Sequence, residues 1–417
     1  MKADQIELMA PAGSFEALQA AIDNGANSVY FGIDQLNMRA VASINFTLDD
    51  LAEISRRCKE ANVKTYITLN TIIYDHDLSV IKRIVDAAMA NDISAIIAAD
   101  QAVLNYAFTQ GMEVHISTQL NVTNIETVKF YANFADVMVL SRELSIQQIT
   151  KICDEVIKQD IRGPKGRLVE IEIFGHGALC MAVSGKCYLS LHSANSSANR
   201  GACKQNCRKK YTVKDEDGYE LEIDNEYIMS PKDLCTLDFL DQIIESGIKV
   251  LKIEGRGRAA DYVAKTIQSY REAIDAVYEG TYTKEKVEGW MNHLKSVYNR
   301  EFWGGYFLGK KIGEWSDSPG SKATVTKVFV GKGMHYYKKP KIAQIAMKSH
   351  DIKIGDTILV TGPTTGAQEF VIKSMFVNEQ PAEKAVKGDD VTIPVDFVVR
   401  ASDKVYKMVD SKLPELV

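Results

Sequence analysis

Short hydrophobic runs alternate with amphipathic segments along residues 6–256. The runs are apolar at nearly every position, as expected of strands buried on both faces of a parallel sheet. Eight strands are predicted, at residues 6–11, 28–32, 64–70, 94–100, 113–119, 136–141, 169–177 and 249–256. The segments between them, such as FEALQAAIDNGA and DLSVIKRIVDAAMANDI, place apolar residues at helical spacing and carry the Asn or Gly residues that end helices.

Eight strands alternating with helices predict an α/β fold, a (β/α)8 TIM-like barrel. A doubly wound sheet is the alternative, but the first strand is followed by APAGS and not by the GxGxxG turn of dinucleotide-binding sheets. About 70 residues separate the seventh strand from the eighth. Because the loops after the strands build the active site in such barrels, this insertion is expected at the functional face.

The pattern changes near residue 300. The Gly-rich stretch WGGYFLGKKIGEWSDSPGSK, at 303–322, predicts a linker. From Ala323 onward, short strands broken by turn residues predict a small antiparallel β-barrel. The sequence therefore predicts a (β/α)8 domain over 1–300, a linker over 301–322 and a β-barrel domain over 323–417.

Composition places the chain among ordinary globular proteins, with 46% hydrophobic and 25% charged residues. A formal net charge of −5 argues against a general polyanion binder but allows a local basic patch. The N-terminal MKADQIELMAPAG lacks the basic head and apolar run of a secretory signal. The sequence contains no run of about 18 apolar residues, so it does not predict a membrane span. We expect a cytoplasmic protein, and nothing in the sequence indicates its oligomeric state.

Cysteines are concentrated in the predicted insertion, where five of the seven fall within 56 residues. They are Cys180, Cys187, Cys203, Cys207 and Cys235. Their spacing fits neither a paired-CxxC zinc ribbon nor a Cys2His2 finger, but loops can still bring four thiolates to one iron–sulfur cluster. Free cysteines with packing roles are the alternative. In a reducing compartment, clustered thiols bind metal more often than they form disulfides, so the density favours a metal or cluster site.

Polar side chains lie at or after the ends of the predicted strands. They include Arg39, Asn70, Asp100, Gln119, Arg142, Glu143, His176, Glu254 and Arg256. Solvated loop residues are the alternative for each one, but three arginines at one barrel mouth predict an anionic ligand, since guanidinium groups pair with carboxylates and phosphates. The basic segment NRGACKQNCRKKY, at 199–211, can contact an RNA backbone or can simply be a solvated surface.

Several reaction classes lack their defining residues. The chain contains no HExxH, no GxSxG and no P-loop. Zincin peptidases, hydrolases with a nucleophile elbow and nucleoside triphosphatases are therefore not indicated.

The segment EIFGHGALCMAVSGKCYLS, at 172–190, resembles the signature of peptidase family U32, the collagenase-like group. Further matches follow along nearly the whole chain: LMAPAGS, NMRA, HISTQLNVTN, LSREL, NRGACKQNCR, SPKDLC and KIEGR. Some members are named as proteases. Others are implicated in oxygen-independent hydroxylation of tRNA, ribosomal RNA or a ubiquinone precursor, and these carry a [4Fe–4S] cluster. The length and the single C-terminal β-barrel are most similar to the tRNA hydroxylation branch.

That resemblance implies hydroxylation of a tRNA wobble uridine to 5-hydroxyuridine, with prephenate as the hydroxyl source. It implies cluster ligands at Cys180, Cys187, Cys203 and Cys235, and it leaves Cys207 doubtful because a C-x3-C pair can supply two ligands. A peptidase acting on collagen is the alternative. A scaffold for a ubiquinone-type complex is a third possibility, which the extra β-barrel disfavours.

Site residues follow from this hypothesis. The catalytic candidates are His176, Arg142, Glu143 and Glu254, and the substrate-binding candidates are Arg39, Asn70, Gln119 and Arg256. Arg142 and Arg256 would bind a small dicarboxylate such as prephenate, and His176 would orient the substrate or transfer a proton near neutral pH. The C-terminal domain and the basic segment would dock the tRNA.

Overall fold

Eight parallel strands close into a barrel in the computed structural model, which describes residues 6–40, 45–212, 214–218, 227–309, 313–317 and 320–412. The strands are β1 (Glu7–Pro11), β2 (Ser28–Phe31), β3 (Lys64–Leu69), β4 (Ala95–Ala98), β5 (Val114–Ile116), β6 (Val137–Val139), β7 (Glu170–Gly177) and β9 (Val250–Ile253). Strand β9 closes the barrel, because Val250 pairs with Glu7 of β1 on one side and with Glu172 of β7 on the other. The predicted (β/α)8 barrel is confirmed.

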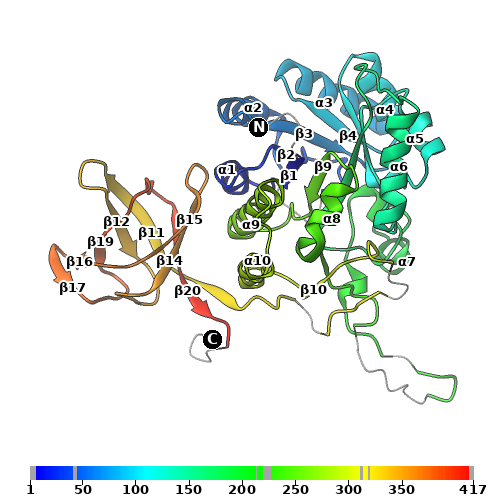
Figure 1. Cartoon of the computed structure of the whole chain (residues 1–417). Coiled ribbons are helices and arrows are strands. Elements are labelled where there is room, and N and C mark those ends of the chain that lie inside the picture. The colour runs from blue at the N-terminus through cyan, green and yellow to red at the C-terminus, as the bar shows by residue number, and fades with distance from the viewer. Residues whose placement is uncertain are drawn as a thin grey trace.

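Helices surround the barrel on its outer side (Figure 1). They are α1 (Phe15–Asp23), α2 (Leu51–Glu60), α3 (Leu78–Ala90), α4 (Gln101–Thr109), α5 (Ile125–Tyr131), α6 (Ile146–Lys158), α8 (Leu240–Glu245) and α9 (Ala260–Tyr278). Several begin at a side-chain cap that accepts a hydrogen bond from a backbone N–H, as Ser14, Asp100 and Asn124 do. Among the helices in the described ranges, none has the length and apolar character that crossing a membrane requires.

The insertion between β7 and β9 contains a short helix, α7 (Leu189–Ala194), and a strand that the hydrophobic pattern did not predict, β8 (Asp233–Cys235). Strand β8 runs antiparallel to the end of β7, with Cys235 opposite His176. Strand β10 (Phe302–Trp303) then pairs with β8, after α10 (Lys284–Ser296). Trp303 and Phe307 are buried, so the start of the predicted linker packs onto the barrel domain. The domain boundaries themselves stay a prediction.

The C-terminal part forms antiparallel sheets around a core of its own, as expected from its alternating pattern. One sheet has the strand order β15-β14-β20-β11-β12-β19-β16-β17. Its strands in chain order are β11 (Val325–Tyr337), β12 (Ile342–Met347), β14 (Thr357–Gly362), β15 (Gly366–Val371), β16 (Met375–Val377), β17 (Gln380–Ala382), β19 (Asp390–Pro394) and β20 (Lys404–Asp410). A second sheet pairs β13 (Ile352–Lys353) with β18 (Lys384–Ala385).

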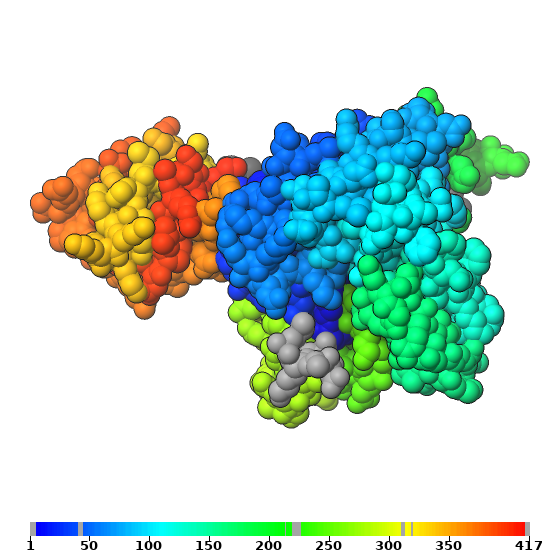
Figure 2. Space-filling view, turned by 90° about the horizontal axis from the view of Figure 1, so that it is seen from above, coloured from blue at the N-terminus to red at the C-terminus, as the bar shows by residue number. Residues whose placement is uncertain are grey.

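This β domain packs beside α1 and α9 of the barrel (Figure 2). Gly366 has a φ of +67°, and a Cβ there would lie 3.1 Å from the backbone nitrogen of Ala20, so the turn before β15 approaches α1 closely. Lys265 of α9 pairs with Glu369 of β15 at 3.0 Å. The contacts hold the β domain on the outer side of the barrel.

Lys252 and Glu172 form a buried ion pair in the barrel interior. Lys252 Nζ lies 2.8 Å from Glu172 Oε1, and the side chains are 5% and 0% exposed. The ammonium group also lies 4.5 Å from the centroid of the Tyr30 ring, a cation–π distance. Buried charges are costly to desolvate, so each of the two groups depends on the other.

We predict that Lys252→Met destabilises the fold by about 3–5 kcal/mol, because Glu172 is left as an unpaired buried charge. Urea unfolding followed by circular dichroism measures the loss. The double variant Lys252→Met/Glu172→Leu removes both charges and should recover most of the stability. A single variant as stable as wild type would show that the pair does not govern the stability of the interior.

Candidate functional site

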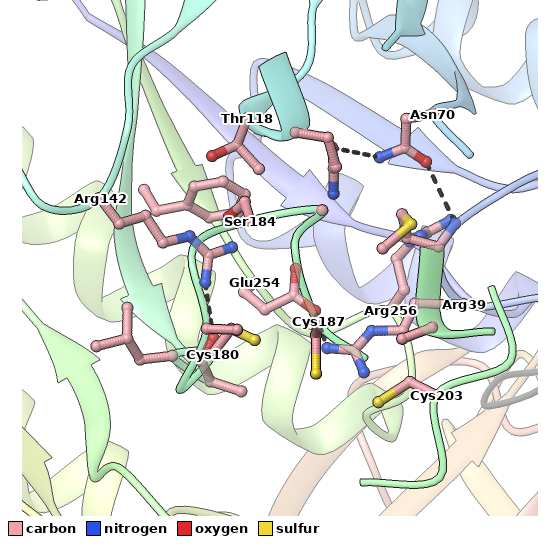
Figure 3. Close-up of a pocket in the computed structure, with 18 of the residues that line it drawn as sticks. Arg39, Asn70, Thr118, Arg142, Cys180, Ser184, Cys187, Cys203, Glu254 and Arg256 are labelled. Carbon is pink, nitrogen blue, oxygen red and sulfur yellow. Dashed lines mark hydrogen bonds and ion pairs between the residues drawn. The ribbon is translucent and has the colours of Figure 1, made fainter. Parts of the chain in front are cut away.

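A cavity of about 270 Å³ opens at the carboxyl ends of the barrel strands. Its walls come from the loops after β2, β3, β5, β6 and β9 and from residues 178–208 of the insertion. Side chains from these elements converge on the same space (Figure 3). The cavity therefore lies where barrel folds build active sites.

Positive charge dominates the cavity wall. Seven cationic side chains contribute to it, whereas Glu254 is the single acidic residue among the described residues that line the cavity. The cations are Arg39, Arg142, Arg208, Lys252, Arg256, Arg258 and Arg300. Low-dielectric walls strengthen the attraction of such a cavity for anions. The expected ligand class is a small molecule with carboxylate or phosphate groups.

Glu254 is held as an anion at the centre of this charge. Its carboxylate lies 2.8 Å from Arg39 and accepts a hydrogen bond from the Tyr30 hydroxyl at 3.2 Å. Burial by itself would raise the pKa of Glu254, but Arg39, Arg142 and Arg256 outweigh it and hold the pKa at about 2. Glu254 is therefore ionised near neutral pH, which suits it to orienting the arginines and not to donating a proton.

Arg142 lies in the cavity wall. Its guanidinium stacks 3.8 Å from the centroid of the Phe174 ring, and NH1 donates to the carbonyl of Ala178 at 3.1 Å. The buried Nε of Arg142 and the buried hydroxyl of Thr118 have no partner among the described residues.

Arg256 is fixed from the opposite side of the barrel. Its NH1 donates to Thr68 Oγ1 at 2.7 Å and to Asn37 Oδ1 at 3.0 Å, and its buried Nε has no described partner. Gly32 makes this arrangement possible, because a Cβ there would lie 2.8 Å from Arg256 NH1 and 2.6 Å from Asn37 Nδ2. The site thus requires a glycine directly after β2.

Asn70 and Gln119 form a neutral part of the wall. The Asn70 amide donates to Ser117 Oγ and to Gln119 Oε1, each at 3.2 Å, and its carbonyl oxygen accepts from the backbone N–H of Met38 at 3.2 Å. Ser117 also donates to Gln119 Oε1. The network ties the loops after β2, β3 and β5 together, and both predicted binding residues line the cavity.

Four cysteines line the same cavity: Cys180, Cys187, Cys203 and Cys207. The labelled thiols of Cys180, Cys187 and Cys203 lie around one side of it in Figure 3. Burial raises the pKa of Cys207, and the neighbouring Cys180, Cys203 and Cys187 raise it further, so the four thiols interact electrostatically. The structure brings in Cys207, which the sequence comparison left doubtful.

Cys235 lies elsewhere. It is buried on β8, with its sulfur 3.7 Å from the Tyr270 hydroxyl and 3.7 Å from the sulfur of Met291. Burial raises its pKa to about 12, so the thiol stays protonated. The structure thus separates Cys235 from the three cysteines with which it was grouped.

The donor set can be tested against the implied metal groups. Within the described ranges, no three His, Cys, Asp or Glu side chains are close enough to hold a single metal ion. A four-iron cluster takes one thiolate on each of its iron atoms, so its ligands stand farther apart than those of one zinc ion. Four thiols around one cavity, beside cations such as Arg208, therefore fit a cluster in number and chemistry.

Residues 13–317 match the family model described as peptidase family U32. The chain belongs to this family. A "Collagenase" of Porphyromonas gingivalis is 51% identical over 408 residues, which cover 98% of this chain and 99% of that protein. "tRNA hydroxylation protein P1" of Bacillus subtilis is 32% identical over 365 residues, covering 86% and 83%. "23S rRNA 5-hydroxycytidine C2501 synthase" of Escherichia coli is 34% identical over 276 residues, covering 66% of this chain and 40% of that protein.

His176 lies outside the cavity of this U32 protein. The ring is 2% exposed and packs among Tyr262, Tyr270 and Phe302, with centroid distances of 6.1, 5.4 and 5.5 Å. Burial, with a smaller contribution from Arg258, lowers its pKa to about 3. A proton-transfer role near neutral pH therefore does not fit His176, because aromatic side chains of α9 and β10 enclose the imidazole.

Glu143 is also away from the site. It is exposed, it does not line the cavity, and its carboxylate accepts a hydrogen bond from Ser141. Among the catalytic candidates the structure leaves Arg142 and Glu254 in the cavity wall. The sequence correctly predicted which loops after the strands form the cavity. It did not predict which side chains of those loops point into the cavity.

Sequence reasoning missed several wall residues, namely Tyr30, Lys252 and Arg300. Lys252 carried a signal, because a charged residue in the middle of the strand KVLKIEGR is unusual and faces the same side as Glu254 and Arg256. Arg300 carried no local signal, since it reaches the cavity from the segment before β10.

We predict that His176 makes stability fall with acidity. Its native pKa of about 3 lies below the unfolded value of 6.5, so the unfolded chain binds the extra proton between these pH values. The contribution is complete above pH 6.5 and is lost towards pH 3, at up to about 1.4 kcal/mol per pH unit. Urea titrations across this range should show a shallower pH slope for His176→Gln than for wild type. Equal slopes would contradict the buried neutral imidazole.

Proposed function

We propose that this protein is an oxygen-independent RNA hydroxylase that converts a tRNA wobble uridine to 5-hydroxyuridine. The observation that carries the proposal is the shared cavity, in which four thiols and the anion-binding arginines face one another. Relatives named for tRNA and ribosomal RNA hydroxylation support an RNA substrate. The cytoplasm is the expected location, because tRNA is found there.

Cys180, Cys187, Cys203 and Cys207 would hold a [4Fe–4S] cluster. When bound, the cluster supplies one-electron redox chemistry at the cavity wall. Burial raises the pKa of Cys207 and Arg208 lowers it by a smaller amount, and Arg208 also donates to the carbonyl of Leu179 at 2.6 Å. We place Cys207 in this set instead of Cys235 because Cys207 lines the cavity and Cys235 does not.

The arginines would bind the hydroxyl donor, for which prephenate is the proposed dicarboxylate. Arg142 and Thr118 line the cavity and would bind one carboxylate, and Arg256 would bind the other. The overall exchange balances when the C–H of the base becomes C–OH and the donor carbon exchanges its hydroxyl for that hydrogen. The base loses two electrons and the donor gains them, so no oxygen molecule is consumed.

A collagen-directed peptidase is the alternative, and the 51% identity to a protein named collagenase favours it. The cavity lacks the usual catalytic groups for that reaction. No histidine is among the described residues that line the cavity, so Ser117 and Ser184 have no imidazole base in its wall, and His192 lines only an adjoining hollow. Because the cavity wall lacks a histidine base, the peptidase is the weaker of the two hypotheses.

We predict that Cys207→Ala, purified anaerobically, loses most of its bound iron and its absorbance near 400 nm, because a cluster ligand is gone. Cys235→Ala should keep both, because its thiol is protonated and faces the core. Cys58→Ala and Cys153→Ala are matched controls, since both residues are buried away from the cavity. Iron and sulfide assays measure the outcome. Loss of iron in Cys235→Ala with retention in Cys207→Ala would reverse the assignment.

Nucleoside mass spectrometry of tRNA from a deletion strain tests the reaction. We expect 5-hydroxyuridine and its derivatives to fall, and complementation with Arg142→Lys to restore them poorly, because a lysine cannot form the forked contact. Unchanged levels in a strain without a paralogue would refute the hydroxylase. Gelatin cleavage by purified protein, abolished by a substitution in the cavity wall, would establish the peptidase instead.

A further inference from the structure

A second, open hollow adjoins the cavity. Among the described residues it is lined by Ala182, Lys186, Cys187, Tyr188, Leu189 and His192. Three of these, Ala182, Cys187 and Leu189, also line the main cavity. The two spaces therefore share a wall that contains one of the proposed cluster ligands, and a ligand in the hollow would lie directly beside the reacting centre.

Tyr188 is the most conspicuous side chain of this hollow. It is 70% exposed, the highest value among the exposed large apolar residues in the described ranges. Met181, Val183, Leu189 and Leu191 are also exposed, so the rim of the cavity presents an apolar strip. Exposed apolar surface of this kind marks an interaction site, and an exposed aromatic ring next to a cavity offers a flat stacking surface.

Charge around Tyr188 indicates the kind of partner. Residues 178–212 contain six Lys or Arg residues and no Asp or Glu, although the whole chain has a net charge of −5. The six are Lys186, Arg200, Lys204, Arg208, Lys209 and Lys210. Lys186, Lys204 and Lys209 are exposed, while Arg208 turns into the cavity. A basic surface that also carries an aromatic platform is complementary to a single-stranded nucleic acid.

The fold keeps these cations next to the platform. The backbone N–H of Lys204 donates to the buried hydroxyl of Ser190 at 3.0 Å, and the amide of Asn206 donates to the carbonyl of Leu189 at 3.3 Å. The basic loop is thereby fastened to α7, which begins directly after Tyr188. Lys186 precedes the platform by two residues and lines the same hollow.

We propose that Tyr188 stacks an unpaired base of the substrate RNA at the entrance of the cavity, with Lys186 and Lys204 contacting the flanking phosphates. The proposal rests on the proposed function and adds the substrate class, a single-stranded or looped RNA segment, and the point where it enters. A collagen peptide could also contact an apolar rim, but the exposed Lys186, Lys204, Lys209 and Lys210, on a stretch that contains no Asp or Glu, favour a polyanion.

Fluorescence anisotropy with a labelled oligouridylate tests the platform on the full-length protein purified anaerobically. Tyr188→Ala should raise the Kd about 5- to 150-fold, because base–aromatic stacking contributes on that scale. Tyr188→Phe should bind as wild type does, since the ring and not the hydroxyl stacks. Lys186→Ala and Lys204→Ala should each lower the salt dependence of log Kd by about 0.7. Phe130→Ala removes a ring that is 61% exposed on α5 and should change nothing.

Controls separate the platform from the cluster and from the reaction. Tyr188→Leu keeps apolar bulk without a ring, so weak RNA binding by this variant at wild-type iron content assigns the effect to stacking. Wild-type affinity in both Tyr188→Ala and Tyr188→Leu would overturn the proposal. So would a loss of gelatin binding in these variants with RNA binding intact. If Tyr188→Ala hydroxylates RNA with an unchanged KM, the stacking role of Tyr188 is refuted and the proposed reaction is not. If RNA binding depends on Tyr188 but the protein hydroxylates no RNA, the proposed reaction is refuted and the stacking role is not.

Discussion

Closure of the barrel by β9 is the constraint on which the site depends. Strand β9 hydrogen-bonds to β1 and to β7, so the first and seventh strands of the barrel are joined through β9, its eighth strand. Alternate residues from this strand onward face the same side, and Lys252, Glu254 and Arg256 all reach the cavity. In the closed barrel, these three residues, spaced two apart in the sequence, form a row of charged side chains from the core to the cavity opening.

This row places one carboxylate, that of Glu254, among the cationic side chains of the cavity. Glu254 is buried, yet three arginines keep it ionised, and it holds them in return through its contact with Arg39. Several cations without an equal number of anions are unfavourable in a shielded space. Seven cationic side chains and one carboxylate among the described lining residues leave the cavity wall with an excess of positive charge. An anionic ligand would offset this charge, which is the physical basis of the proposed carboxylate ligand.

The insertion supplies the chemistry that the barrel lacks. Its first part returns over the mouth and brings four thiols to the arginine-lined wall, while its second part forms β8 and covers the end of β7. Covering this strand end buries His176 and Cys235 together on the far side of the sheet from the cavity. The antiparallel pairing of β8 with β7 therefore places His176 and Cys235 in the core and not in the cavity wall.

The sequence by itself determined the barrel, the place of the insertion and the concentration of cysteines and arginines at the mouth, because hydrophobic periodicity and strand-end position are local properties. Asn70, Gln119, Arg39, Arg142, Glu254 and Arg256 were all predicted at the cavity and line it. Only the tertiary structure places Cys207 in the cavity wall and Cys235 in the core, and only it places His176 and Glu143 outside the cavity. The positions of His176 and Cys235 depend on the pairing of β8 with β7, and a three-residue strand far along the chain leaves no periodic signal of that pairing.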